Sequence, residues 1–299
     1  MRRLDCLIKA ALVLTACALE TGAVLAAPVA FDYAVRARST LATFGIPTSV
    51  NDQTYFDAAT TAAASDSFTD TSTGRDFALD GTARLSTGQL RVQNQGTGGP
   101  AGGQSNTVTF LFSEFLETFY FTGDYSSTPL RLPFTATFEG TWTGANISSG
   151  SADPTVQIFT WLWFADSTLS FTQDDWLNTS GLFFREGEIE KYVDSINVIS
   201  DGAQRPILIE YSGTLDLSGV NPLLRAWMGI EADVNNASAN GSWNANFANT
   251  ATLSFDFTGL DVRSASGQFP GAQSVPEPAT LALLGLGLAG LAASRRRRH

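Results

Sequence analysis

Cysteine and histidine are almost absent from this sequence, and the few that occur stand near its ends. Among 299 residues there are two cysteines, Cys6 and Cys17, and one histidine, His299. A domain that begins after residue 26 therefore has no disulfide, and it cannot form a Ser-His-Asp triad, a Cys-His pair or a histidine-ligated zinc or iron site. Its core must come from burial alone, for which about 250 residues suffice. We expect no cofactor.

Lysine is scarce as well, and positive charge is concentrated at the two ends. The chain carries 18 basic and 29 acidic side chains; without residues 1–26 and 277–299, 11 basic and 26 acidic ones remain, a net charge of −15. So negative a field repels phosphate backbones. We therefore expect no nucleic-acid partner.

The N-terminal residues have the pattern of a secretory signal peptide. A basic start precedes an apolar stretch at residues 10–19, and small residues suited to signal peptidase precede residue 27. We expect residues 1–26 to be the signal peptide. In an alternative interpretation, residues 14–17 (LTAC) resemble a lipobox, which would make Cys17 the acylated first residue of a lipoprotein.

Three features follow one another at the C-terminus. A Val275-Pro276-Glu277-Pro278 motif precedes an uncharged apolar run at residues 279–293, and four arginines follow, Arg295, Arg296, Arg297 and Arg298. As a helix the run is roughly 22 Å long, a short transmembrane segment compared with a hydrocarbon core of ~30 Å. The arginines favour the cytoplasmic side, which places the preceding domain outside the inner membrane.

Residues 275–299 resemble the PEP-CTERM sorting signal of exopolysaccharide-producing Gram-negative bacteria. The resemblance implies that an exosortase, a membrane transpeptidase-like enzyme, recognises the tail and processes it near the Pro-Glu-Pro motif. It further implies that the protein is anchored in the inner membrane until the domain is released or transferred to the cell surface or extracellular matrix. It implies nothing about what the domain does there.

Between the two ends, apolar and polar residues alternate with a period of two. In residues 131–143 one face of such a run consists of Leu132, Phe134, Ala136, Phe138, Gly140 and Trp142. Eight or more runs of this kind predict an all-β fold, an antiparallel, jelly-roll-like β-sandwich over residues 27–262.

The remaining segments are predicted to be short helices or linkers. Helices are expected at residues 54–64 and 173–177. Glycine- and serine-rich composition predicts a flexible tether at residues 263–274, between the domain and the sorting signal at residues 275–299.

Three groups of residues are candidates for a functional site. On a strand, Glu186, Glu188 and Glu190 would share one face with roughly 6.8 Å per two residues. This pattern resembles the carboxylates of laminarinase-type glycosidases, which use a nucleophile and an acid. It departs from them at Gly187, and a solvated acidic face is the simpler interpretation.

The second group is a possible calcium loop, and the third is the tryptophans. Asp70, Ser72 and Asp76 alternate around a glycine as calcium ligands do, although no bidentate glutamate follows and a polar turn is the competing interpretation. Exposed tryptophans stack on sugar rings, whereas buried ones build the core. Trp142 is expected in the core, and the others are Trp161, Trp163, Trp176, Trp227 and Trp243.

The sequence therefore predicts an exported, exosortase-sorted surface or matrix protein with a structural, adhesive or polysaccharide-binding role rather than an enzyme. Exopolysaccharide is the expected partner besides signal peptidase and the exosortase. One alternative is a secreted glycan-active hydrolase that uses a carboxylate pair. Another is an assembly subunit whose sheet edges pair with copies of itself.

Overall fold

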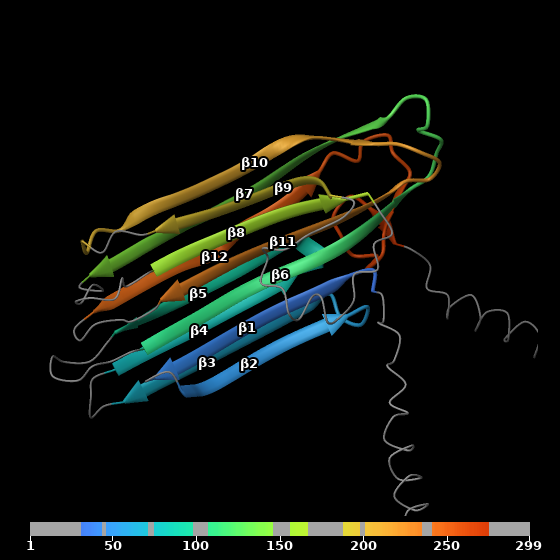
Figure 1. The fold of residues 1–299 in the computed structure, drawn as a ribbon. Helices are drawn as coiled ribbons and strands as arrows, with labels where there is room; N and C mark the ends of the chain where they lie inside the picture. The colour runs from blue at the N-terminus through green and yellow to red at the C-terminus, as the bar shows by residue number, and fades with distance from the viewer. Residues whose placement is uncertain are drawn as a thin grey trace, which may run out of the picture.

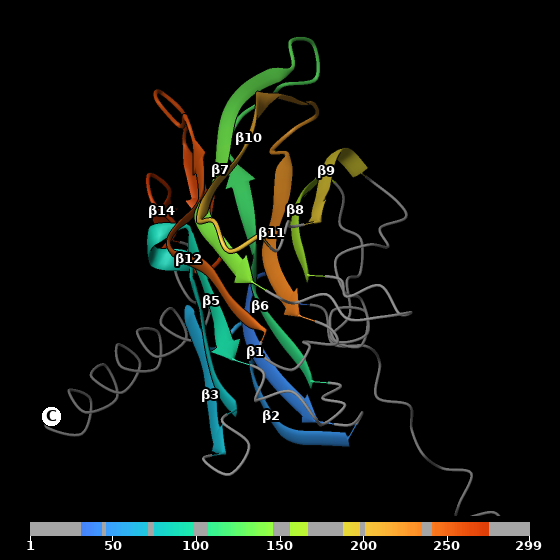
Figure 2. The ribbon, with the colours of Figure 1, turned by 90° about the vertical axis from the view of Figure 1, so that its left-hand side faces the viewer.

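The computed structural model describes residues 31–43, 46–70, 75–97, 107–145, 156–166, 188–197, 201–234 and 241–274. They form two antiparallel sheets that lie face to face (Figures 1 and 2). Sheet I contains β1 (Ala34–Thr43), β2 (Ile46–Phe56), β6 (Thr107–Phe121), β8 (Val156–Ala165), β9 (Glu188–Asn197), β11 (Leu223–Val234), β13 (Val262–Ser264) and β14 (Gln273–Ser274). This confirms an all-β fold of antiparallel sheets.

Sheet II has six strands in the order β10-β7-β12-β5-β4-β3. Their bounds are β3 (Thr61–Asp70), β4 (Arg75–Arg84), β5 (Gln89–Thr97), β7 (Leu130–Ala145), β10 (Arg205–Leu217) and β12 (Ser242–Phe255), with a short 3-10 helix (Leu85–Thr87) between β4 and β5. The alternation predicted for residues 131–143 is seen in β7, where Leu132, Ala136, Phe138 and Trp142 are fully buried. Each sheet thus turns one apolar face toward the other.

Aromatic rings fill much of the space between the sheets. Phe119 of sheet I lies at the centre of one group: its ring centroid is 5.1 Å from that of Phe255, 5.4 Å from that of Phe257 and 5.0 Å from that of Phe269. Ring pairs at such distances contribute beyond the area they bury. These contacts join β6, the end of β12 and the segment after β13.

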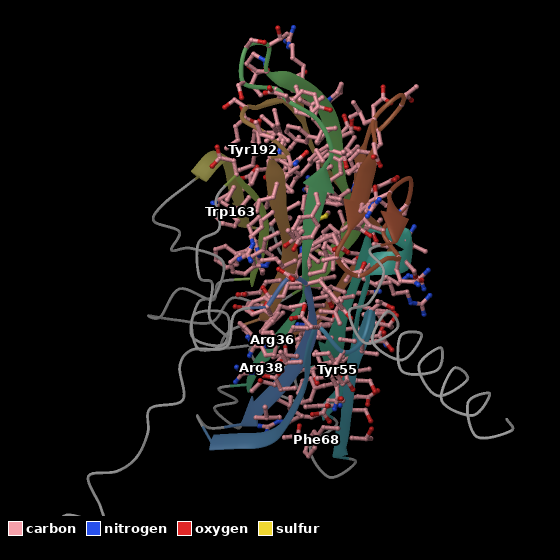
Figure 3. All side chains as sticks on the ribbon, turned by 90° about the vertical axis from the view of Figure 1, so that its right-hand side faces the viewer. Arg36, Arg38, Tyr55, Phe68, Trp163 and Tyr192 are labelled. Carbon is pink, nitrogen blue, oxygen red and sulfur yellow. The ribbon has the colours of Figure 1, made fainter. Side chains whose placement is uncertain are left out.

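The two long sides of the fold are closed by side chains. At one side Tyr192 of β9 stacks on Tyr211 of β10, with centroids 4.9 Å apart, and at the other Tyr55 of β2 and Phe68 of β3 pack against the core (Figure 3). Side-chain hydrogen bonds also connect the sheets, because the amide of Asn94 on β5 donates to the Thr109 hydroxyl on β6, at 3.1 Å, and to the Ala232 carbonyl on β11, at 2.9 Å.

The prediction of a helix at residues 54–64 is wrong. Residues 54–56 end β2, and residues 61–64 begin β3, where Ala62 and Ala64 are buried opposite Ala83 and Gly81 of β4. Alanine favours helices in isolation, but here small side chains allow the strand to pack closely against its neighbour, so pairing outweighs propensity. Residues 173–177 lie outside the described residues.

Residues 263–274 belong to the folded domain, which corrects the expected tether. Val262 and Ser264 are buried in β13, which pairs with the end of β6, and Phe269 is 2% exposed. The carboxylate of Glu117 on β6 accepts hydrogen bonds from the backbone N–H of Ser266, at 3.1 Å, and from its hydroxyl. The glycine- and serine-rich composition of this segment predicted a linker and gave no sign of these contacts.

Among the residues that the structure describes, no helix is long and apolar enough to cross a membrane. The signal peptide, including Cys17, and the sorting signal at 275–299 lie outside that part of the chain.

The buried Glu117 makes a pH-dependent contribution to stability. Burial raises the pKa of Glu117 from its ordinary value of 4.5 to about 8, although hydrogen bonds from Ser266 lower it. Between those values the folded state holds a proton that the unfolded chain has released, so the free energy of unfolding falls as pH rises from 4.5 to about 8.

We expect Glu117→Gln to make that fall shallower, because a neutral amide does not titrate. Urea denaturation of residues 27–274 at a series of pH values measures it, with exposed Glu210→Gln as the matched control that keeps the wild-type slope. An unchanged slope in Glu117→Gln would show that Glu117 is not the group responsible.

Candidate functional site

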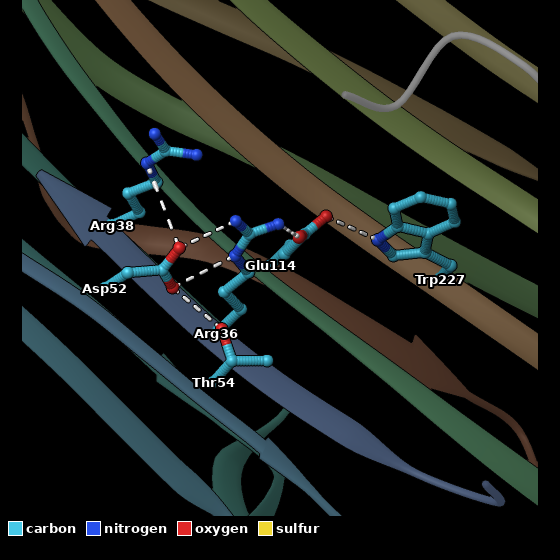
Figure 4. Close-up of polar contacts among 6 residues, drawn as sticks. All are labelled: Arg36, Arg38, Asp52, Thr54, Glu114 and Trp227. Carbon is cyan, nitrogen blue, oxygen red and sulfur yellow. Dashed lines mark hydrogen bonds and ion pairs between the residues drawn. The ribbon is translucent and has the colours of Figure 1, made fainter. Parts of the chain in front are cut away.

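An ionic and aromatic cluster covers the outer face of sheet I (Figure 4). Arg36 of β1 donates two hydrogen bonds to Asp52 of β2, at 3.1 and 2.7 Å, and its Nη1 lies 3.7 Å from Oε1 of Glu114 on β6. Trp227 of β11 donates from Nε1 to Glu114 Oε2 at 3.0 Å. Strand pairing explains the arrangement, because Arg36 stands directly opposite Glu114. We call Arg36, Asp52, Phe112, Glu114, Trp161, Trp163 and Trp227 the ionic–aromatic cluster.

The two carboxyl groups beside Arg36 have opposite pKa shifts. For Glu114, burial raises the pKa to about 8, although Arg36 and Trp227 lower it. For Asp52, burial also raises the pKa, but hydrogen bonds from Arg36 and Thr54 outweigh it and the net pKa is below 3.8. At neutral pH, therefore, Asp52 carries the negative charge that pairs with Arg36, and Glu114 is mostly protonated.

Two further carboxyl groups of the same face share β11. Burial raises the pKa of both Glu231 and Asp233, and the negative charge of Glu231 raises that of Asp233 further. A hydrogen bond between the two side chains lets them share a proton. They alternate along β11 with residues of the core between the sheets and so lie on its outer face, where Glu231 is buried.

Burial rules out this cluster as an open platform for sugars. Trp161, Trp163 and Trp227 are at most 5% exposed. They share the outer face of sheet I, whereas Trp142 and Trp243 lie in the core between the sheets. Trp176 lies outside the described residues. Within the described chain, then, every tryptophan ring is packed against protein.

One glycine allows this packing. Gly229 of β11 stands opposite both Glu114 and Trp161, and a Cβ at this position would lie 1.9 Å from the indole carbons of Trp161. The bare backbone therefore seats the Trp161 ring, which meets Trp227 edge-on at 6.4 Å.

Of the three carboxylates proposed from the sequence, the structure describes the surroundings of one, Glu190. Glu190 of β9 stands opposite Phe164, is partly buried and accepts a hydrogen bond from the Tyr192 hydroxyl at 2.5 Å. Glu188 stands opposite Ala165, with a register shift between the two positions that breaks the even spacing of a single face. Glu186 lies outside the described residues.

The possible calcium loop is only partly described. Asp76 of β4 accepts a hydrogen bond from the Thr69 hydroxyl at 2.8 Å, and Asp70 pairs through its backbone with Arg75. Ser72 lies outside the described residues. In the described ranges, no three His, Cys, Asp or Glu side chains are placed to share a metal ion.

Two open hollows lie over sheet II. One, of about 430 Å³, is lined mainly by polar residues of β3, β4 and β5: Ser65, Asp66, Ser67, Ala78, Leu79, Asp80, Gln93 and Gln95. The other, of about 310 Å³, continues toward β12 and β7 and is lined by Asp76, Ala78, Gln95, Gly96, Thr97, Thr143, Ser242, Trp243 and Asn244. Because both include Ala78 and Gln95, we treat them as one polar trough that crosses the strands.

The trough offers hydrogen-bonding groups beside a comparable share of apolar surface. Gln93 donates to Gln95 at 3.3 Å, a long and weak bond that leaves both amides able to turn to a ligand. The side-chain oxygen of Asn244 has no hydrogen-bond partner among the described residues. Ala78 provides a low floor between these polar walls. Such planar amides and carboxylates can bind hydroxyl groups in pairs.

Neither the ionic–aromatic cluster nor the polar trough was predicted from the sequence. Arg36 and Glu114 are far apart in the chain and meet only because β1 pairs with β6. The trough had a weak signal, the alternation of Gln93 and Gln95 with buried Val92 and Asn94, which marks an outward polar face of one strand. Nothing in that signal says which strands lie beside it.

The C-terminal tail matches a known family model. Residues 274–298 match the model of the PEP-CTERM protein-sorting motif. No curated protein matches this chain. The match confirms the resemblance of the tail and implies that the protein is exported, recognised by an exosortase and sorted to the cell surface.

We expect Arg36→Met to destabilise the domain by about 3 kcal/mol, because it leaves the Asp52 carboxylate without the buried guanidinium that donates two hydrogen bonds to it. The matched control is Arg38→Met, because the Arg38 side chain is 35% exposed and its Nε lies 3.8 Å from Oδ2 of Asp52; this change should cost under about 1 kcal/mol. Denaturant unfolding measures both. Equal losses would mean that the buried pair has no special weight.

We expect Gly229→Ala to lower stability by about 1–3 kcal/mol and to shift the tryptophan emission, because the added methyl displaces Trp161. Gly213→Ala is the graded control, since its Cβ would lie 2.9 Å from the edge of the Phe134 ring. Thermal unfolding followed by fluorescence compares them, and a Gly229→Ala domain as stable as wild type would contradict the packing described.

Proposed function

We propose that this exported, exosortase-sorted protein is a surface or matrix protein that binds polysaccharide in the polar trough of sheet II. The observation that supports the proposal is the pair of adjoining hollows that share Ala78 and Gln95. Their walls come from strands of one rigid sheet, so their amide and carboxylate groups are held at fixed spacings. A polymer whose repeating unit is rich in hydroxyl groups can occupy both hollows at once.

The charge of the trough narrows the polymer class. Asp66, Asp76 and Asp80 line it, and no lysine or arginine is among its lining residues. A polymer of uronic acids would meet like charge there and on the acidic domain as a whole. Neutral polysaccharides are therefore the proposed ligands, with each sugar hydroxyl pairing with an amide or carboxylate oxygen.

The same geometry favours binding over hydrolysis. Glycoside hydrolysis needs two carboxyl groups on either side of the bond, one of them protonated. The carboxyl groups whose pKa is raised all lie outside the lining of the trough: Asp57, Glu114, Glu117, Glu231 and Asp233. A binding role is the proposal, and hydrolysis is an outcome that its test can detect.

The test is retention of residues 27–274 on a panel of neutral and anionic polysaccharides, with reducing ends measured in the same samples. We expect retention on a neutral polymer without release of reducing ends. Gln95→Ala, which alters both hollows, should weaken binding by about tenfold, as loss of one or two hydrogen bonds does.

The matched control is Thr214→Ala, an exposed position of β10 outside the trough. It should bind as wild type. Failure to bind any polymer, or equal binding by Gln95→Ala and wild type, would refute the proposed site, and release of reducing ends would identify a hydrolase instead.

A further inference from the structure

The folded domain continues to the first residue of the sorting motif. β14 (Gln273–Ser274) pairs in parallel with β13, with Arg263 opposite Gln273 and Ser264 opposite Ser274. The family match begins at residue 274. The sheet and the sorting signal thus meet without a spacer. We call residues 265–274 the C-terminal latch.

Several contacts hold the latch on the sandwich. The Ala265 N–H donates to the Thr118 carbonyl at 2.9 Å, and Ser266 donates to Glu117 from both its N–H and its hydroxyl. Phe269 is buried against Phe119 and lies 6.1 Å, centroid to centroid, from Phe115. These contacts fix the start of the tail to β6, a central strand of sheet I.

The reach of the chain limits how a membrane enzyme can approach the motif. From Ser274 to Pro278 the backbone extends at most about 14 Å, at 3.3–3.6 Å per residue. Any peptide bond of the Pro-Glu-Pro motif therefore lies within that distance of the sheet edge. An exosortase active site that binds an extended segment must also accept the residues on the N-terminal side of the cleaved peptide bond. These residues include Val275 and, directly before it, the two residues of β14.

We propose that the C-terminal latch must detach from the sandwich before the exosortase can process the tail. The latch then acts as a gate whose opening equilibrium sets the rate of processing, as cleavage of a transiently opened segment follows its open population. This inference builds on the exosortase signal and is independent of polysaccharide binding.

The latch is suited to open by itself, without unfolding of the sheets. β13 and β14 comprise three and two residues, and β14 pairs only with β13 among the described strands. Gly267 and Gly271 adopt positive φ angles of 66° and 82° at its turns. Short pairing and glycine turns make a segment that separates at lower cost than the long strands beneath it.

A disulfide that locks the latch tests the proposal directly. Arg263→Cys combined with Gln273→Cys places two thiols on directly paired residues, and the exported domain has no other cysteine with which they could pair. In a host with an exosortase, we expect the full-length double variant to be processed at least about tenfold more slowly, and added reductant to restore the rate. Arg263→Cys alone is the control and should be processed as wild type.

A loosened latch should have the opposite effect. Phe269→Ala removes the buried ring of the latch, so processing should become faster by on the order of tenfold. Phe77→Ala is the control for general destabilisation, because Phe77 is a buried core ring of β4 that stacks on Phe68 and Trp243 rather than on the rings that hold the latch. It should not accelerate processing in proportion to its loss of stability.

A flexible insert between the C-terminal latch and the sorting signal tests whether the latch acts because it adjoins the motif. Eight glycine and serine residues placed between Ser274 and Val275 should make processing insensitive to both the disulfide and Phe269→Ala. The proposal is overturned if the oxidised double-cysteine chain is processed at the wild-type rate, or if the insert leaves the effect of the disulfide unchanged.

Discussion

The contact on which most of this structure depends is the packing of Phe119 against three rings from two other segments. Phe119 belongs to β6, which also pairs with β1, β11 and β13, so it stands where sheet I has the most neighbours. Phe255 brings in the end of β12 from sheet II, and Phe269 brings in the latch. With no cysteine after residue 17, ring contacts of this kind hold the layers together.

The two outer faces of the domain differ in how far their polar groups are buried. On sheet I, Arg36, Glu114 and the tryptophans are buried, so their charges and rings stabilise the sheet from outside the main core. On sheet II, the amides and carboxylates of the polar trough stay open to solvent. The net charge of −15 and the polar outer face of sheet II suit the proposed contact with neutral polymers. They also disfavour self-association through an exposed apolar patch.

The sequence predicted individual strands better than it predicted which strands lie side by side. Alternation through Leu132, Phe134 and Phe138 predicted β7 because a half-buried strand repeats every two residues. The pairing of Arg36 with Glu114 had no local signal, since it depends on β1 lying beside β6. Residues 265–274 were misjudged because their glycine and serine content is typical of a linker, while one buried ring, Phe269, and one distant carboxylate, Glu117, decide their place.

Hydrogen–deuterium exchange of the domain, residues 27–274, tests most directly whether the folded body extends to the sorting signal. We predict that the amides of Ala265 and Ser266 exchange well below the unprotected rate, because they donate to Thr118 and Glu117, yet faster than the amides of β6 and β11 beneath them. Exchange of these two amides at the unprotected rate would contradict it, and would return the segment to the tether that its composition suggests.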